Sequence, residues 1–115
     1  MTDLREREAV ERERQRHQLD EFLGDATRDV GRMRGLVAEL EAGDPAAWAR
    51  VQNLAHNLAA RAQALRLGVM TAAARELERF ADEHQNGAPL DDFFVQCVGS
   101  AIETLALEIA ALKRA

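Results

Sequence analysis

The chain has 115 residues, of which 47% are hydrophobic, and its formal net charge at pH 7 is −5. This length fits one domain that buries roughly two-thirds of the surface of its unfolded chain. The hydrophobic content excludes an intrinsically disordered chain. The acidic charge balance gives no electrostatic support to nucleic-acid binding.

The residue types favour helices throughout, because only two prolines and seven glycines interrupt a chain rich in Ala, Leu, Glu and Arg. The single cysteine, Cys97, cannot form an internal disulfide, which fits a reducing compartment. It falls on an apolar helical stripe, so a buried thiol is expected. The sequence shows neither a signal peptide nor an apolar run of 18 residues, so we expect a cytoplasmic protein that does not bind membranes.

Residues 1–18 form a segment of a different character, dominated by Arg and Glu. Its apolar residues between positions 3 and 18 are Leu4, Ala9 and Val10. Opposite charges four residues apart support a helix by only a few tenths of a kcal/mol per pair, too little for a free helix of this length. The sequence therefore predicts a frayed, charged helical arm. The alternative is a short helix that caps the rest of the domain or mediates self-association.

Four amphipathic helices are predicted after the arm, near residues 19–42, 45–66, 69–84 and 90–113. The first has its apolar stripe at Leu19, Phe22, Leu23, Ala26, Val30, Met33, Val37 and Leu40. Gly43 provides a left-handed C-terminal stop, Asp44 an N-cap, and Pro45 the first position of the second helix.

The other three helices have equally regular stripes. The second has Trp48, Val51, Ala55, Leu58, Ala62 and Leu65; the third has Met70, Ala73, Ala74, Leu77, Phe80 and His84. The last has Leu90, Phe94, Cys97, Ala101, Leu105, Ile109 and Leu112, widened by Phe93, Val98 and Ile102. Short connections between four such helices predict an all-α domain over residues 19–115, an antiparallel up-down four-helix bundle.

His56 lies outside the stripe of its helix, about 140° from the centre of that stripe, so its side chain should face solvent. The residues expected around it are uncharged: Gln52, Asn53, Ala59, Ala60 and Gln63. Exposed helix faces normally carry charged residues, so a histidine on an uncharged surface suggests a functional site. The alternative is a solvated histidine among alanines chosen for helix propensity.

These residues resemble the histidine phosphotransfer (HPt) domain family. The resemblance lies in Leu40-x-x-Gly43-Asp44, Ala55-His56-x-Leu58, Leu65 and Ala74-x-x-Leu77-Glu78, and extends over roughly residues 19–113. Leu77 and Glu78 stand 21 and 22 residues after His56, the offsets typical of the family. The resemblance implies that His56 carries a phosphoryl group and exchanges it with aspartates of response-regulator receiver domains. A hybrid histidine kinase is a further candidate partner.

The sequence also departs from the family pattern. Family members usually have Lys-Gly three and four residues after the histidine, where this chain has Ala59 and Ala60. A glycine is also common ten residues after it, where this chain has Arg66. The resemblance therefore leaves a second interpretation, an HPt-like binding module that docks receiver domains or other partners without phosphotransfer.

The expected chemistry requires no cofactor in this chain. An imidazole with an ordinary pKa of about 6.5 is largely neutral, and hence nucleophilic, at pH 7. Gln52, Asn53 and Gln63 could orient the ring or bind phosphoryl oxygens, with Arg66 as the cation nearest the edge of this surface. The partner would supply Mg²⁺. No phosphate-binding loop, hydrolytic triad or inward-facing carboxylate is readable, so we expect neither ATP-dependent kinase activity nor a metal site, and we expect a monomer.

Overall fold

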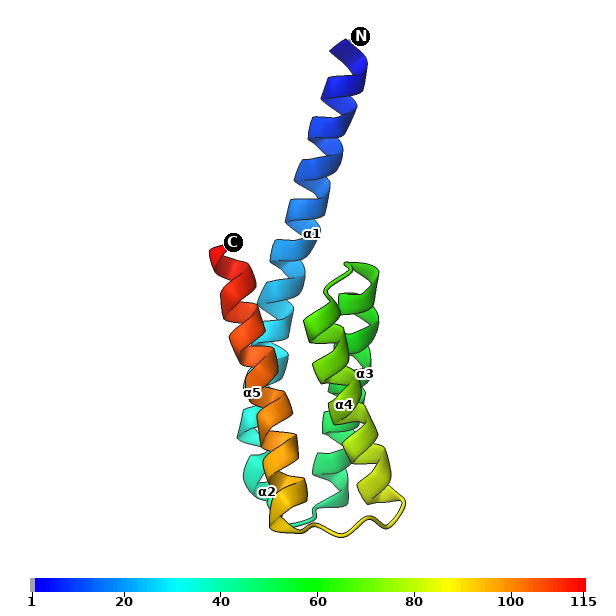
Figure 1. Cartoon of the computed structure of the whole chain (residues 1–115), viewed down its shortest axis with the longest axis vertical. Coiled ribbons are helices and arrows are strands. Elements are labelled where there is room, and N and C mark those ends of the chain that lie inside the picture. Colours follow the sequence, from blue (N-terminus) through cyan, green and yellow to red (C-terminus); the bar gives the residue numbers. More distant parts are fainter. Residues whose placement is uncertain (1) are drawn as a thin grey trace.

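The computed structural model describes residues 2–115, and every regular element in this range is an α-helix. The helices are α1 (Thr2–Gly35), α2 (Val37–Glu41), α3 (Pro45–Ala64), α4 (Gly68–Gln85) and α5 (Asp92–Arg114). The molecule is elongated, with extents of 62 × 24 × 20 Å (Figure 1). The all-α class predicted from the sequence is confirmed.

The four long helices pack in a closed ring, in which α1 contacts α3 and α5, and α4 also contacts α3 and α5. Figure 1 shows that α1 and α4 run downwards, whereas α3 and α5 run upwards, so neighbours in the ring point in opposite directions. The short α2 lies at the lower end against α1 and α3. This arrangement places α3 and α4 side by side over their whole length.

The core consists of the apolar stripes of these helices, and no polar side chain is buried among the described residues. Its largest fully buried side chains are Trp48, Phe22, Met33, Leu58, Met70, Leu77, Ile102, Leu105 and Val51. Two predictions for the last helix are wrong. Cys97 is only half-buried, and Phe93 is 75% exposed. Val98, Ala101, Ile102, Leu105 and Ile109 form the buried face of α5 instead.

Aromatic side chains join the helices at the lower end of the molecule. The Trp48 ring lies 4.8 Å from that of His84 and 5.9 Å from that of Phe94, between ring centroids. Phe80 packs edge-on against Phe94 at 5.4 Å. The indole N–H of Trp48 donates to the Leu40 carbonyl at 3.1 Å, which ties α2 to α3. The polar atom of the buried indole is thereby satisfied.

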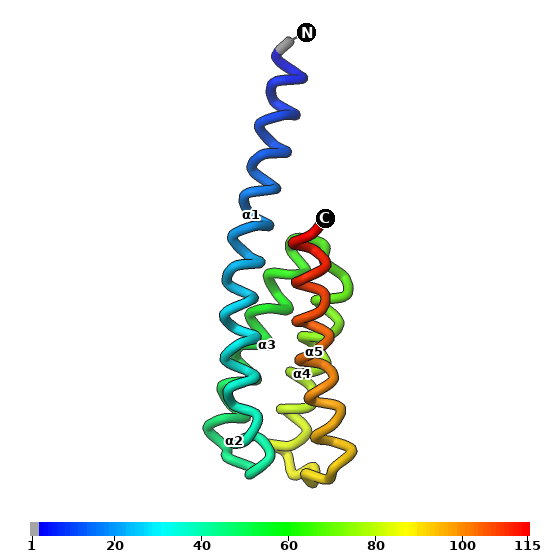
Figure 2. The backbone as a smooth tube through the Cα atoms, turned by 90° about the vertical axis from the view of Figure 1, so that its left-hand side faces the viewer, coloured from blue at the N-terminus to red at the C-terminus, as the bar shows by residue number. Residues whose placement is uncertain are grey.

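The N-terminal arm is the first part of α1 rather than a frayed segment. Helix α1 is continuous over 34 residues, so the predicted helix start at residue 19 is wrong. The physical reason is that the arm extends a helix whose nucleus is already held by the core, and extension avoids the cost of nucleation. Residues 3–18 are exposed and project beyond the other helices (Figures 1 and 2).

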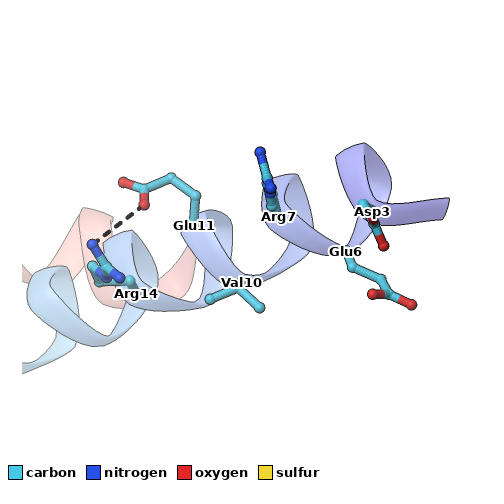
Figure 3. A pocket seen from close by; sticks show the side chains of 6 residues that line it. All are labelled: Asp3, Glu6, Arg7, Val10, Glu11 and Arg14. Atoms are coloured by element: carbon cyan, nitrogen blue, oxygen red, sulfur yellow. Dashed lines mark ion pairs between the residues drawn. The ribbon is translucent and has the colours of Figure 1, made fainter. Parts of the chain in front are cut away.

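The surface of the arm is made by one helix alone. Its side chains radiate from that helix (Figure 3), and Arg14 pairs with Glu11 at 3.6 Å between nitrogen and oxygen. Leu4 and Val10 are 65% and 57% exposed. The arm therefore does not cap the bundle, which contradicts one of the alternatives drawn from the sequence.

The predicted helix 19–42 is interrupted at Leu36, where a turn separates α1 from α2. The Leu36 amide donates to the Met33 carbonyl at 3.1 Å, a tightened three-residue spacing. Gly35, directly before the turn, is a weak helix former with open space around it. The interruption redirects the chain towards α3.

The predicted boundary before α3 is confirmed. Gly43 has a φ of 77°, the left-handed conformation that favours glycine. The Asp44 side chain accepts a hydrogen bond of 3.0 Å from the Ala46 amide, and Pro45 occupies the first helical position.

Helix α5 is long and apolar enough to cross a membrane, judged by length and composition alone. In this structure its buried face packs in the core against α1 and α4. Glu103 and Glu108 interrupt its apolar sequence, and Arg34 of α1 donates two hydrogen bonds to Glu103, at 3.0 and 2.8 Å. In this structure α5 is therefore one of the packed helices of the bundle.

Candidate functional site

His56 lies in the second half of α3, and its side chain is 61% exposed. The exposure predicted from the helical phase is therefore confirmed. Leu58, two residues later, is buried, so the two side chains point to opposite sides of α3. Packing of Leu58 in the core therefore sets the rotation of α3 that directs the His56 imidazole towards solvent.

Glu78 of α4 contacts the imidazole directly, with 2.7 Å between its Oε1 atom and Nδ1 of His56. The prediction of a surface without acidic groups around His56 is wrong. A helical wheel of α3 contains only the residues of α3, whereas this carboxylate arrives from the neighbouring helix. Leu77 is fully buried and anchors α4 beside it, and Glu78 is left at the edge of the helix pair, 27% exposed.

The Glu78 contact determines which ring nitrogen of His56 is available. An ionised carboxylate only accepts hydrogen bonds, so Nδ1 must carry the proton and donate. In the neutral ring, Nε2 then holds the lone pair. Among residues 2–115, none forms a hydrogen bond with Nε2. The arrangement holds an exposed imidazole in the tautomer whose free nitrogen is a nucleophile.

A cationic side chain that sequence reasoning missed belongs to the same cluster. Arg75 of α4 lies one turn before Glu78, and its Nη1 atom is 3.6 Å from Glu78 Oε2. Its Nη2 atom donates to the side-chain oxygen of Gln63 on α3 at 2.8 Å. The cluster thus runs His56–Glu78–Arg75–Gln63 across both helices. The three-residue spacing of Arg75 and Glu78 was readable, but their proximity to His56 depended on how α3 and α4 pair.

The other residues predicted around His56 divide into two groups. Asn53 and Ala60 are exposed and Gln52 is half-buried, as a surface beside the ring requires. Ala59 is fully buried, so its predicted place on this surface is wrong. The reason is that α3 packs against both α1 and α4, which makes its buried sector broader than one stripe.

Two cations near the C-terminal end of α3, Arg61 and Arg66, have separate roles. Arg61 lies away from the site, where it donates to Asp25 at 2.9 Å and covers the Phe22 ring at 5.1 Å. Its hydrogen bond is the main cause that lowers the pKa of Asp25. Arg66 lines an open depression between α3 and α4 with residues that include Gln63 and Arg75. It is therefore close to the cluster, although no contact with His56 exists.

Arg66 has a φ of 59°, the one left-handed residue other than glycine among residues 2–115. It follows the end of α3, where its amide donates to Gln63 O at 3.0 Å and the Leu67 amide donates to Ala62 O at 2.9 Å. This pairing is a Schellman motif, whose left-handed position glycine occupies without strain. An arginine instead of a glycine at this position therefore costs backbone free energy at the end of α3.

Replacing Arg66 with glycine is expected to stabilise the domain by about 1 kcal/mol, because a left-handed conformation penalises side chains with a Cβ atom. Urea denaturation followed by circular dichroism measures the change. Arg50→Gly, at an exposed position inside α3, is the control and should destabilise by a similar amount. A loss of stability in Arg66→Gly would contradict the strain assigned to this residue.

Comparison with protein-family models, with curated proteins and with solved structures finds no match for this chain. Its function is therefore inferred from the geometry and chemistry of the site. No group of three or more His, Cys, Asp or Glu side chains within residues 2–115 is arranged to hold a metal ion.

Proposed function

We propose that this chain is a histidine-containing phosphotransfer protein of a two-component phosphorelay. His56 accepts a phosphoryl group from the aspartate of one receiver domain and donates it to the aspartate of another. The observation that carries the proposal is the exposed imidazole whose Nδ1 is held by Glu78 at 2.7 Å. The antiparallel up-down four-helix bundle expected of an HPt domain is the fold proposed for residues 19–115.

The transfer step needs few groups from this chain. Nε2 of His56 attacks the phosphorus of an aspartyl phosphate; the new N–P bond forms as the O–P bond breaks, and the aspartate leaves as a carboxylate. The ring keeps its Nδ1 proton and gains positive charge. The Glu78 carboxylate, hydrogen-bonded to that proton, stabilises the charged ring. The Mg²⁺ that assists departure of the aspartate belongs to the receiver domain.

Arg75 supplies the positive charge that the family's lysine would otherwise provide. A phosphoryl group on His56 adds roughly two negative charges beside Glu78. The Arg75 guanidinium already contacts Glu78 and Gln63, so it stands within one helical turn of the residue that holds the ring. Such a group can stabilise the phosphoryl oxygens without a lysine at position 59.

The receiver domain would dock around His56 on the exposed face of α3 and α4. Gln52, Asn53, Ala60 and Gln63 provide uncharged or small side chains there. Arg66 and Arg75 border the depression at the upper end of this face. A partner with an acidic phosphorylation site would meet these cations on approach, which favours fast association.

The experiment that tests the proposal presents this chain with a panel of receiver domains phosphorylated on aspartate with radioactive phosphate. Transfer of label to the chain, and from the labelled chain to a second receiver, is the expected result. The same mixtures with ATP alone should give no label, because a phosphoryl carrier needs a phosphorylated partner. Absence of transfer from every receiver would contradict the proposal.

A second function is a docking module that binds receiver domains without phosphotransfer. The observation that favours it is the lack of any lysine beside His56, with Ala59 buried and Ala60 the small exposed residue in place of the family's Lys-Gly. Binding of a receiver in titration calorimetry, together with no label on the chain, would establish this function instead.

Replacing Glu78 is expected to slow phosphoryl transfer. Glu78→Ala removes the hydrogen bond to Nδ1 and frees the ring to rotate and change tautomer, so the transfer rate should fall roughly 10- to 100-fold. Glu78→Gln keeps an oxygen acceptor and should lose less. Rapid-quench measurement of label transfer gives both rates. Glu76→Ala, an exposed carboxylate on the same helix, is the matched control.

A further inference from the structure

The outer face of α5 carries an uncharged stripe that faces away from the core. Its members alternate at spacings of four and three residues: Phe93, Cys97, Ser100, Thr104, Leu107 and Ala111. Phe93 is 75% exposed and Leu107 is 70% exposed, and both are among the large apolar side chains that the bundle leaves in solvent. Cys97 is half-buried at the edge of the stripe.

Helix α5 therefore has two apolar or uncharged faces, whereas the bundle uses only one. The buried face, from Val98 to Ile109, accounts for the amphipathic pattern of a bundle helix. A free outer face would normally carry charged residues. A spacing that alternates between four and three residues is instead the seam of paired helices, in which residues of each helix fit between those of the other.

The charges at the two ends of α5 determine how a second helix can lie on this stripe. Exposed Asp92 stands beside the stripe at the N-terminal end and exposed Arg114 at the C-terminal end, whereas Asp91 caps α5 and Lys113 donates to Thr27 of α1. Two α5 helices packed antiparallel place the acidic end of each beside the basic end of the other. A parallel pair would bring like charges together at both ends. Charge complementarity thus favours an antiparallel pair of identical helices.

The side chains of the stripe also complement one another in the register that these charges require. When Asp92 lies opposite Leu112 of the other copy, close to Arg114 of that copy, Phe93 lies opposite Ala111 and Cys97 opposite Leu107. Each large side chain then meets a small one, and Ser100 meets Thr104 at the centre, where small residues let the helices approach. The pairing is two-fold symmetric, because each contact occurs twice.

We propose that the outer face of α5 binds the same face of a second copy, forming an antiparallel homodimer. This inference replaces the monomer expected from the sequence and does not depend on phosphotransfer. In the ring of helices α5 is diagonal to α3, so the dimer leaves both His56 side chains facing solvent. The arm offers no comparable stripe, because its exposed Leu4 and Val10 are separated by charged residues.

The first test measures the mass of the full chain by sedimentation equilibrium over a range of concentrations. The expected result is association to twice the 12.8 kDa mass of one chain. Leu107→Glu places a charge in the seam and should raise the dissociation constant at least tenfold, with unchanged helicity. Thr104→Glu should act in the same way. Leu4→Glu makes the same substitution at an exposed leucine of the arm and should leave the dissociation constant within twofold.

The second test fixes the orientation through the native thiol. In the antiparallel dimer, Cys97 lies far from its own counterpart but beside position 107 of the partner. Wild-type protein should therefore resist oxidative cross-linking, whereas Leu107→Cys should form a disulfide between Cys97 and the new thiol of the other copy. Cleavage after Glu103 separates the two thiols for peptide mapping.

Three results would overturn the proposal. One is a wild-type chain that remains monomeric at high micromolar concentration. Another is association lost in Leu4→Glu but kept in Leu107→Glu, which would assign the contact to the arm. The third is a monomer in solution that sediments with phospholipid vesicles and is released by Leu107→Glu, which would make the stripe a lipid-binding face.

Discussion

Replacing His56 with glutamine is expected to remove all phosphoryl label from the chain while the fold stays intact. Glutamine has a similar length and can still donate to the Glu78 carboxylate, but it has no nucleophilic nitrogen in place of Nε2. Because the histidine side chain is 61% exposed, the substitution should change the free energy of unfolding by no more than about 0.5 kcal/mol.

The measurement compares wild type, His56→Gln and His17→Gln after incubation with a labelled receiver domain. His17 is exposed on the arm, outside the cluster, so His17→Gln should take up label as the wild type does. The bound label should be lost in acid and kept in alkali, as expected of phosphohistidine. Label that persists in His56→Gln would place the phosphoryl acceptor elsewhere and would contradict the proposed function.

The helical periodicity predicted most of the core, because each stripe depends on residues close together in the chain. Phe22, Trp48, Leu58, Leu77 and Leu105 were all assigned to the interior and are fully or almost fully buried. The boundary at Asp44 was equally readable, since N-caps and prolines act within one helical turn. Local patterns therefore sufficed wherever the determining interactions were local.

The features that periodicity missed depend on contacts between helices. Glu78 lies 22 residues from His56 in the chain, and only the pairing of α3 with α4 brings its carboxylate to the ring. Ala59 is buried because two neighbours, rather than one, cover α3. The Leu77-Glu78 pair in the HPt resemblance was the available signal for the first contact. The resemblance pointed to Glu78 but did not predict its hydrogen bond with His56.

The last helix shows a different limit. Phe93 was assigned to the interior because it is large and apolar, yet it lies on the outer face of α5. When a helix has two uncharged faces, its hydrophobic pattern alone does not identify which face is buried in the core. The buried phase was decided by packing, with Val98, Ala101 and Ile102 fitting between α1 and α4. The exposed apolar residues that remain are the basis for the proposed α5 interface.

Truncation of Leu58 to alanine is expected to lower the free energy of unfolding by about 2–5 kcal/mol, since a fully buried leucine leaves a cavity when it is shortened. Leu58 is 1% exposed in the core of the bundle. Urea denaturation at a fixed protein concentration measures the loss. Leu4→Ala makes the same chemical change at a side chain that is 65% exposed, and should cost no more than about 0.5 kcal/mol.

The Leu58 result also bears on the site, because Leu58 and His56 occupy opposite sides of one helix. A large loss in Leu58→Ala, with little change in His56→Gln, would fix the rotation of α3 that exposes the imidazole. A loss below about 1 kcal/mol for Leu58→Ala would mean that this side chain is not in the core. The rotation of α3 would then be wrong, and His56 would not stand beside Glu78 on the proposed docking face.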